Sequence, residues 1–282
     1  MLTVHNFQYG VLTPALGYLM SFLGSFIGLR CTARSQVSTG ASRVRWLVIG
    51  AVSIGITGIW VMHFIAMLGF AIPGETIRYS VPITLGSMLL AVMFVLIGLL
   101  IVGLRPTTWR SLLLGGVVTG LGVAAMHYSG MAAMRMPARM SYDPELFGAS
   151  IVIAIIAATA ALWAALRLRG FWPALGAAAI MGVAVSGMHY TGMAAMHVYR
   201  ATGPMAMGGA SAEAFLLPLI IGISVITFVM TATIALAPNE AEISEDAELM
   251  RRIDDIRAQP PIVVNPVIVS APDRRTFRRS SL

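Results

Sequence analysis

Hydrophobic residues dominate the chain in seven long runs, and short segments between these runs hold most of the charged residues. No Asp, Glu or Arg lies inside any run. A helix needs about 20 apolar residues to cross the roughly 30 Å hydrocarbon core of a bilayer. The pattern therefore predicts an all-α integral membrane protein with seven transmembrane helices. The runs are Tyr9–Leu29, Trp46–Phe70, Val81–Gly103, Leu112–Met134, Ala149–Leu166, Phe171–Met196 and Phe215–Leu236.

Composition supports the bilayer as the natural solvent of this chain. Hydrophobic residues make up 57% of it and charged residues 11%, whereas roughly 25% of a soluble domain is charged. The net charge of +7 comes largely from arginines that flank the runs, which is typical of membrane orientation; no nucleic-acid partner is expected. The single cysteine, Cys31, excludes an intrachain disulfide and a thiolate metal cluster.

The arginines of the short loops predict how the chain crosses the membrane. Cytoplasmic loops carry an excess of Arg and Lys, so the arginine-rich side without acidic residues is expected to be cytoplasmic. The N-terminus is then outside and the C-terminus inside. The cytoplasmic arginines are Arg30, Arg34, Arg43, Arg45, Arg105, Arg110, Arg167 and Arg169. The outer side holds Arg78, Arg135, Arg139 and Arg200, balanced by Glu75, Asp143, Glu145 and Glu213.

A nine-residue motif recurs at the outward ends of three runs. The residues of Met126–Met134 recur almost identically in Met188–Met196, and Met62–Met67 is a less similar copy. The histidines of successive copies are 64 and 62 residues apart, which equals one out-and-back helical hairpin. Residues 8–237 are therefore expected to form a membrane domain of three parallel two-helix repeats plus a C-terminal helix. Small residues upstream of each motif, such as Gly55 and Gly120, would let helices approach closely.

Beyond Pro238 the composition changes. Asn239–Arg257 is charged and has helical spacing of apolar residues, and four prolines and an arginine-rich end follow. Residues 238–282 are therefore expected to be a short cytoplasmic tail, partly helical and then disordered. We expect the arginines of this tail to be attracted to anionic lipid. The alternative is that the tail is a phosphorylation or docking site.

The repeated motif carries a possible metal-ligand set. A methionine follows each histidine at i+4 on the same helix face, and copies two and three add another at i+7. The methionine before each histidine points about 100° away and belongs either to the site or to a neighbouring interface. The tyrosines that follow two of the histidines can donate hydrogen bonds to the site. The candidate metal ligands are His63, His127, His189, Met67, Met131, Met193, Met62, Met126, Met188, Met134 and Met196.

Imidazoles together with thioethers favour copper, because soft sulfur selects Cu(I). Zinc fits three histidines but does not explain the methionines. The alternative is that the methionines are adaptable packing residues and that each histidine is merely hydrated. Three copies at one depth favour a functional site, because polar residues inside membranes tend to be functional. His5 could reach the same surface, and His197 is better explained as a loop residue.

The three copies read Met188-His189-Tyr190-Thr191, Met126-His127-Tyr128-Ser129 and Met62-His63-Phe64-Ile65. Over residues 8–237 the chain resembles the MHYT family of bacterial membrane sensor domains. The resemblance implies a multi-pass protein of the bacterial inner membrane. It also implies that His63, His127 and His189, with neighbouring methionines, coordinate copper and through it oxygen, carbon monoxide or nitric oxide. Such proteins often carry a cytoplasmic signalling domain, so this chain is expected to signal to a separate partner.

The leading hypothesis is thus a copper-based membrane sensor of a diatomic gas or of redox state. Copper handling or transport and haem binding are the alternatives; methionines such as Met93 and Met181 are too scattered to suggest a conduction path. No Ser-His-Asp arrangement, phosphate-binding glycine loop or intramembrane carboxylate pair can be placed, so the chain is not expected to be an enzyme.

Overall fold

A computed structural model of the chain describes residues 2–104, 108–168, 170–200, 208–236, 248 and 250–253. Contacts divide the chain into two units, Met1–Ala235 and Leu236–Leu282. Most of the helix expected over Asn239–Arg257, and the tail beyond it, lie outside the described residues. The described part of the second unit includes an exposed ion pair of 3.1 Å between Arg252 and Glu248.

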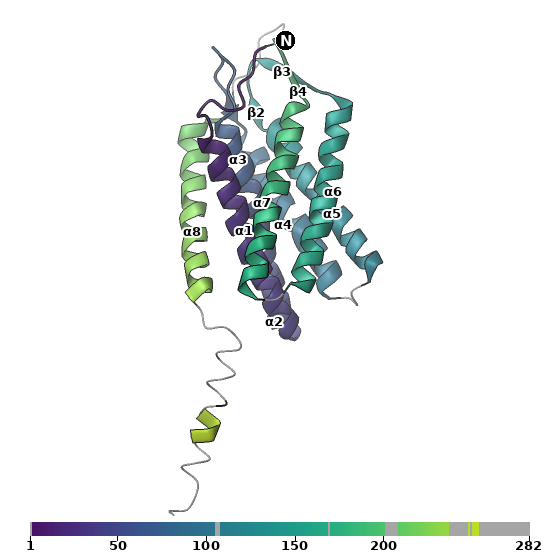
Figure 1. Cartoon of the computed structure of the whole chain (residues 1–282). Coiled ribbons are helices and arrows are strands. Elements are labelled where there is room, and N and C mark those ends of the chain that lie inside the picture. Colours follow the sequence, from purple (N-terminus) through teal and green to yellow (C-terminus); the bar gives the residue numbers. More distant parts are fainter. Residues whose placement is uncertain are drawn as a thin grey trace, which may run out of the picture. The chain divides into compact units, whose positions relative to one another are not determined.

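Among the residues that the structure describes, seven helical spans are long and apolar enough to cross a membrane, which confirms the prediction of an all-α membrane protein (Figure 1). Two of them begin or continue with a stretch of π-helix, labelled η. The spans are α1 (Leu12–Val37); α2 (Gly40–Val52) with η1 (Ser53–Val61) and α3 (Met62–Leu68); α4 (Val81–Gly103); α5 (Trp109–Ala132); α6 (Pro144–Arg167); α7 (Phe171–Ala194); and η2 (Ala212–Leu216) with α8 (Leu217–Leu236).

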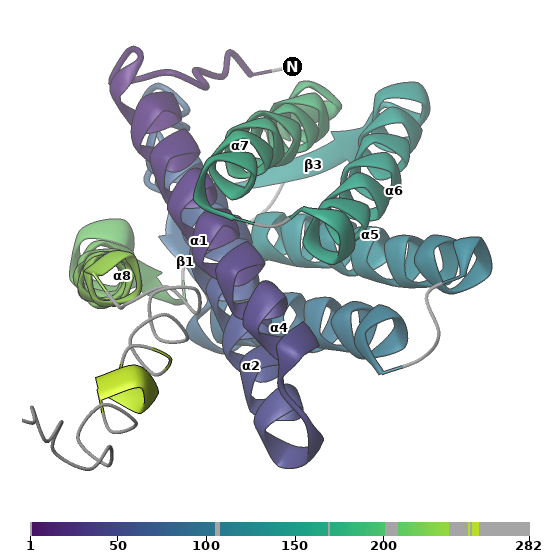
Figure 2. The same ribbon diagram turned by 60° about the horizontal axis from the view of Figure 1, so that its bottom comes forward.

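Six of the spans form a closed ring. The helix α1 contacts α7 and the second span, the second span contacts α4, and α4 contacts α5; α5 then contacts α6, and α6 contacts α7. The remaining helix, α8, lies outside this ring beside α1 (Figure 2). A buried hydrogen bond of 2.8 Å between Thr57 of η1 and Thr227 of α8 ties it to the ring. The ring thus places the histidine-bearing spans alternately with the others.

Glycines allow the close helix approach that the sequence predicted. A methyl group on Gly55 would lie 2.9 Å from Cα of Val92 in α4, and one on Gly120 would lie 2.5 Å from Cα of Ile155 in α6. Real Cβ atoms do not approach a backbone so closely, so a side chain at either position would push the helices apart. The two-helix repeats themselves stay a prediction.

In the described part of the chain, five short strands that hydropathy did not predict lie at the end of the ring near the N-terminus (Figure 1). They are β1 (Arg78–Tyr79), β2 (Met134–Arg135), β3 (Ala138–Tyr142), β4 (Met196–Arg200) and β5 (Ala210–Ser211). One antiparallel sheet has the order β2-β1-β5, and β3 pairs with β4 in another. Because these strands follow α3, α5 and α7, they connect the ends of the three histidine-bearing spans. We call this the strand end of the ring.

The strands also set where two helices stop, which corrects the predicted runs. The sequence placed Met134 and Met196 inside helices, but α5 ends at Ala132 and α7 ends at Ala194. Met134 instead pairs with Tyr79, and Met196 pairs with Tyr142. The hydropathy of a run does not distinguish a helix turn from a short apolar strand, so only the strand pairing shows the boundary.

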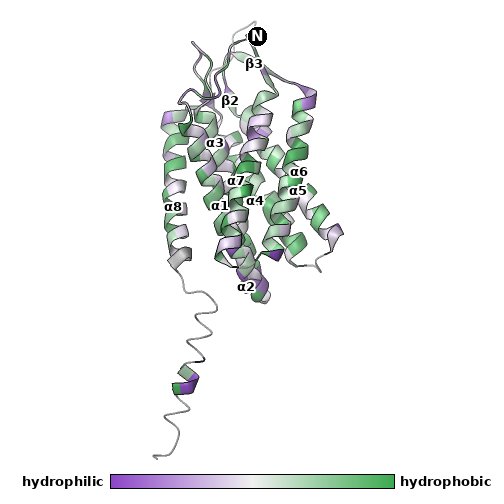
Figure 3. Cartoon of the chain, in the orientation of Figure 1, coloured by the Kyte–Doolittle hydropathy of each residue, from purple (hydrophilic) through white to green (hydrophobic). Residues whose placement is uncertain are grey.

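Apolar side chains cover the outward faces of the helices. Leu89 of α4, Ile156 of α6 and Ile180 of α7 are among the exposed large hydrophobic residues. Figure 3 shows hydrophobic colour along the helices and hydrophilic colour mainly near their ends. A soluble protein rarely exposes so much contiguous apolar surface. The lipid bilayer therefore surrounds the ring.

Candidate metal centre

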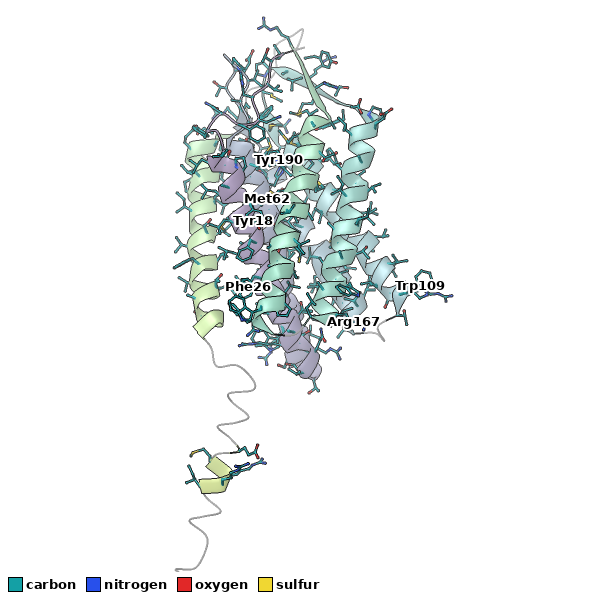
Figure 4. The ribbon with its side chains drawn as sticks, in the orientation of Figure 1. Tyr18, Phe26, Met62, Trp109, Arg167 and Tyr190 are labelled. Carbon is teal, nitrogen blue, oxygen red and sulfur yellow. The ribbon has the colours of Figure 1, made fainter. Side chains whose placement is uncertain are left out.

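Three histidines from three different spans meet inside the ring near its strand end. His63 lies at the start of α3, His127 in α5 and His189 in α7, and their exposed fractions are 0%, 0% and 1%. Figure 4 shows the neighbouring residues Met62 and Tyr190 in the upper half of the ring and Arg167 and Trp109 toward its other end. The predicted convergence is present, but the histidines are fully buried rather than hydrated at an interface.

The Nδ1 atoms of the three imidazoles form a nearly equilateral triangle. The distances are 3.0 Å between His63 and His189, 3.2 Å between His127 and His63, and 3.3 Å between His189 and His127. The centre of this triangle therefore lies about 1.8 Å from each nitrogen. Bonds from zinc to histidine nitrogen are about 2.0–2.1 Å long. A small expansion of the triangle would accommodate a metal ion at or just above its centre.

The three rings stand nearly perpendicular to one another, with interplanar angles of 83°, 78° and 89°. Their Nε2 atoms point away from the centre and have no hydrogen-bond partner among the described residues. A methyl group on Gly130 would collide with Nε2 of His63, and one on Gly192 would collide with Nε2 of His127. Each of these glycines comes three residues after the next histidine, so the ring of His63 packs against α5 and that of His127 against α7.

This arrangement fits a cation chemically. A neutral imidazole has one N–H and one nitrogen lone pair, and three lone pairs directed at one point repel one another unless a positive charge lies between them. With the lone pairs on Nδ1, the protons are on Nε2 and do not block the centre. Within the described residues, the group able to hold a metal consists of these three histidines, without a cysteine or carboxylate. The cluster therefore offers three imidazole nitrogens as donors.

The eight candidate methionines are all buried. The structure places Met62 against α1, since its Cγ would lie 3.5 Å from a methyl group on Gly17. This is the neighbouring interface that its position on the helix allowed. Coordination by methionine sulfur stays a prediction. These methionines are Met62, Met67, Met126, Met131, Met134, Met188, Met193 and Met196.

Two of those methionines require a correction. Met134 and Met196 were predicted to share a helix face with His127 and His189. Because the helices end two residues earlier, Met134 lies in β2 and Met196 in β4. The i+7 spacing on a helix therefore does not describe either residue, and the prediction of a common face is wrong for both.

The aromatic residues beside the histidines have unequal partners. Tyr128 hydrogen bonds to Ser150 at 2.6 Å rather than to a histidine, and the buried hydroxyl of Tyr190 has no partner in the described part of the chain. Sequence reasoning missed Trp60, which is fully buried three residues before His63. Its Nε1 donates to the carbonyl of Thr84 at 3.1 Å and to Oγ of Ser87 at 3.2 Å. A tryptophan one helical turn before a motif histidine was the available signal.

The other two described histidines do not join the cluster. His5 forms an antiparallel bridge with Ala71 at the strand end. His197 lies in β4, where it pairs with Ser141 of β3. The three-histidine group contains neither of them, and His197 lies in a strand rather than in the loop that the sequence suggested.

The fold and the cluster define a multi-pass membrane domain with a histidine centre buried between its helices. The model of a family described as "Bacterial signalling protein N terminal repeat", MHYT, matches the chain twice, over residues 57–116 and 120–178. The chain belongs to the MHYT family. The two matches include His63 and His127, whereas His189 follows the second match.

Curated relatives are bacterial signalling proteins. The chain is 42% identical over 193 residues to the bifunctional diguanylate cyclase/cyclic di-GMP phosphodiesterase MucR of Pseudomonas aeruginosa, covering 67% of this chain and 28% of MucR. It is 39% identical over 199 residues to the cyclic di-GMP phosphodiesterase NbdA of the same species, covering 68% and 25%. It is 31% identical over 206 residues to the signalling protein YkoW of Bacillus subtilis, covering 70% and 25%.

The matched region thus spans about a quarter of the length of these relatives. The activities in their names belong to much longer proteins. No solved structure matches this chain.

Proposed function

We propose that this chain is the sensing part of a membrane signalling system and that its histidine cluster holds copper. The observation that carries the proposal is the triangle of three buried Nδ1 atoms, each 3.0–3.3 Å from the other two. In the tautomer that directs all three Nδ1 lone pairs at the centre, no N–H lies between them, and leaving a buried polar group unsatisfied costs about 1–3 kcal/mol. A bound cation offsets that cost.

Copper is favoured over zinc by the surroundings of the cluster. Imidazole nitrogen binds both metals, but thioether sulfur selects Cu(I). Eight motif methionines are buried in the protein. A bound copper ion would supply reversible one-electron chemistry and affinity for small diatomic ligands, which zinc does not.

The burial of the site limits the signals that can reach it. Hydrated ions would have to shed water to enter the apolar core, at a cost of several kcal/mol per charge. Small uncharged molecules such as oxygen, carbon monoxide or nitric oxide dissolve in lipid and can pass between side chains. We therefore propose a diatomic gas or a change of redox state as the signal.

The three histidines lie on three separate spans, so a change in their spacing moves α3, α5 and α7 relative to one another. The helix α3 contacts both α5 and α7, which makes these spans mechanically coupled. The signal must favour one helix arrangement over another to be transmitted. We propose that a cytoplasmic signalling partner binds at the arginine-rich end of the ring and responds to the movement of these helices.

The orientation in the membrane is part of this proposal. The N-terminus and the strand end would face outward, and the arginine-rich end would face the cytoplasm. A membrane-impermeant maleimide tests this in intact cells through Ser141→Cys in β3 and Thr39→Cys between α1 and α2, both in a Cys31→Ser background. Labelling of position 141 alone is expected, and labelling of position 39 alone would reverse the orientation.

The competing functions fit the geometry less well. A haem with two axial histidines needs a porphyrin plane between them, and nitrogens 3.0–3.3 Å apart leave no room for it. A copper pathway through the membrane would need ligands along its length. Met93 instead lies on the exposed face of α4, and Met181 belongs to a separate core beside α1.

Metal analysis of the purified protein tests the proposal. We expect about one copper ion per chain and a change in the optical and electron paramagnetic resonance spectra on reduction or on addition of carbon monoxide. The variant with His63, His127 and His189 all replaced by alanine should lose the metal. Zinc in place of copper would correct the metal assignment. Stoichiometric copper in the triple variant, or no metal in the unmodified protein, would overturn the site.

A further inference from the structure

A cavity lies on the outside of the ring, between α1 and α8. Its volume is about 810 Å³, within the 300–1,000 Å³ that is common for small-molecule sites. One wall is the first part of α1, from Leu12 to Met20, and the opposite wall is α8, from Leu217 to Val225. Figure 2 shows α8 standing beside α1, apart from the ring.

The walls and the floor of this cavity differ in exposure. Leu12, Leu16 and Leu19 on the α1 wall and Ile221 and Val225 on the α8 wall are exposed hydrophobic residues. The floor consists of buried residues, namely Met20 of α1, Ile65 and Met67 of α3, Phe70 just after α3 and Tyr79 of β1. The cavity is therefore apolar along its length and opens toward the lipid that surrounds the helices.

One end of the cavity is polar and acidic. Glu75, from the segment after α3, and Glu213, from η2, both line it, and none of its lining residues is basic. The nearby Arg78 is directed elsewhere, because its Nε donates to the carbonyl of Gly209 at 2.8 Å. Burial raises the pKa of Tyr79, and the charge of Glu213 raises it further. The negative charge of Glu213 thus reaches the inner surface of the cavity.

A buried hydroxyl group without a partner supports a ligand at this place. Thr13 lines the cavity and is only 5% exposed. Its Oγ1 has no hydrogen-bond partner within the described residues. Serines and threonines in helices commonly donate to a carbonyl of the preceding turn, as Thr32 does to Gly28 in the same helix. The Oγ1 atom is itself buried and lies against Gly69, so a bound molecule reaches this hydroxyl only if that contact opens.

We propose that this cavity binds one membrane phospholipid with an ammonium head group, phosphatidylethanolamine, in the outer leaflet. Its ammonium group would lie between Glu75 and Glu213, Thr13 would donate to an ester or phosphate oxygen, and one acyl chain would lie between α1 and α8. The two carboxylates and the absence of a lining cation favour an ammonium group over an anionic head group. Because Met67 forms part of the floor four residues after His63, lipid in the cavity also supports the helix that carries His63.

Photo-crosslinking of the unmodified protein in nanodiscs tests the site directly. A phosphatidylethanolamine probe with a diazirine on its acyl chain is expected to label the first turns of α1 and the facing part of α8. A phosphatidylglycerol probe with the same acyl chain should label these segments about tenfold less, which corresponds to about 1.4 kcal/mol. Equal labelling by both probes, or adducts spread evenly over exposed faces of α4 and α6, would overturn the proposal.

Variants of the cavity residues distinguish the contribution of the carboxylate charges to lipid binding from that of the cavity's shape. Glu75→Gln with Glu213→Gln should lower phosphatidylethanolamine labelling about tenfold, whereas Glu145→Gln, an exposed acidic residue of α6 outside the cavity, should not. Ser224→Trp fills the cavity without changing its charge and should abolish labelling of α1 by both probes. Undiminished labelling in the charge variant would exclude the role of the carboxylates. Metal content measured on the same samples separates this result from that of the histidine centre, because the glutamates are not in that cluster.

Discussion

In α5 and α7 the motif histidine belongs to an uninterrupted α-helix of 24 residues. In the second span, nine residues of π-helix, Ser53–Val61, come directly before Met62 and His63. The three histidines nevertheless meet in one triangle. The first motif copy, which departs most from the other two in sequence, therefore reaches the common site by a different backbone route.

The π-helix explains how the divergent copy reaches the site. A π-helix pairs residue i with i+5 and widens the turn, so it rotates the residues that follow it relative to a regular α-helix. The same stretch positions Trp60, which is held by Thr84 and Ser87 of α4. Copies two and three place Gly130 and Gly192 against the neighbouring histidine rings, while the corresponding residue of copy one is Ala66. Sequence identity among copies is thus not needed for a shared centre.

The largest expected effect is that of removing one histidine. His63→Ala, His127→Ala and His189→Ala each leave two nitrogens, and we expect a loss of metal affinity of more than about 100-fold, beyond the 10–100-fold usual for residues that only support a ligand. Metal titration of each purified variant measures this. If His63→Ala alone keeps the affinity of the unmodified protein, then His63 is not an equal member of the triangle.

The next effect is that of a methyl group behind a histidine ring. Gly192→Ala should displace His127, because the new methyl collides with Nε2, and overpacking of this kind costs about 1–3 kcal/mol. Gly187→Ala in the same helix meets no atom within 4 Å and should be neutral or stabilising by up to about 1 kcal/mol. Thermal unfolding and metal retention of both variants check this. Equal behaviour of the two variants would contradict the packing of His127 against α7.

A smaller effect tests the route of the second span. Trp60→Phe leaves the carbonyl of Thr84 and the hydroxyl of Ser87 without the indole donor, so the free energy of unfolding should fall by about 1–3 kcal/mol. The matched control is Trp109→Phe, at an exposed position at the start of α5, where a change within about 0.5 kcal/mol is expected. Unfolding in detergent micelles measures both, and a neutral Trp60→Phe would show that these bonds do not hold η1.

The smallest effect distinguishes copies two and three. Tyr128→Phe removes the hydrogen bond to Ser150 and should cost about 0.5–1.5 kcal/mol. Tyr190→Phe removes a buried hydroxyl that has no partner in the described residues, so it should be neutral or slightly stabilising. The same unfolding measurement compares the two variants. A larger cost at Tyr190 would reveal a hydrogen bond to a bound molecule or to water.

Much of the fold follows from the order of residues. Seven apolar runs are each long enough to span a bilayer, and their length alone makes the seven helices necessary. The nearly equal spacing of His63, His127 and His189 predicted that they lie at the same end of alternate spans, and the glycines before the motifs predicted close helix contacts. These properties depend on distance along the chain and on hydropathy, which a sequence states directly.

Three-dimensional packing settles what distance along the chain leaves open. Several features of the site depend on side chains from different helices. They are the direction of the three Nδ1 atoms, the close packing of histidine rings against Gly130 and Gly192, and the hydrogen bond of Tyr128 to Ser150. The ends of α5 and α7 depend on strands that pair with distant segments. Met134 and Met196 therefore lie in strands and not on the predicted helix face. Hydropathy is a property of single residues, whereas each of these features is a contact between residues remote in sequence, and it exists only once the ring has closed.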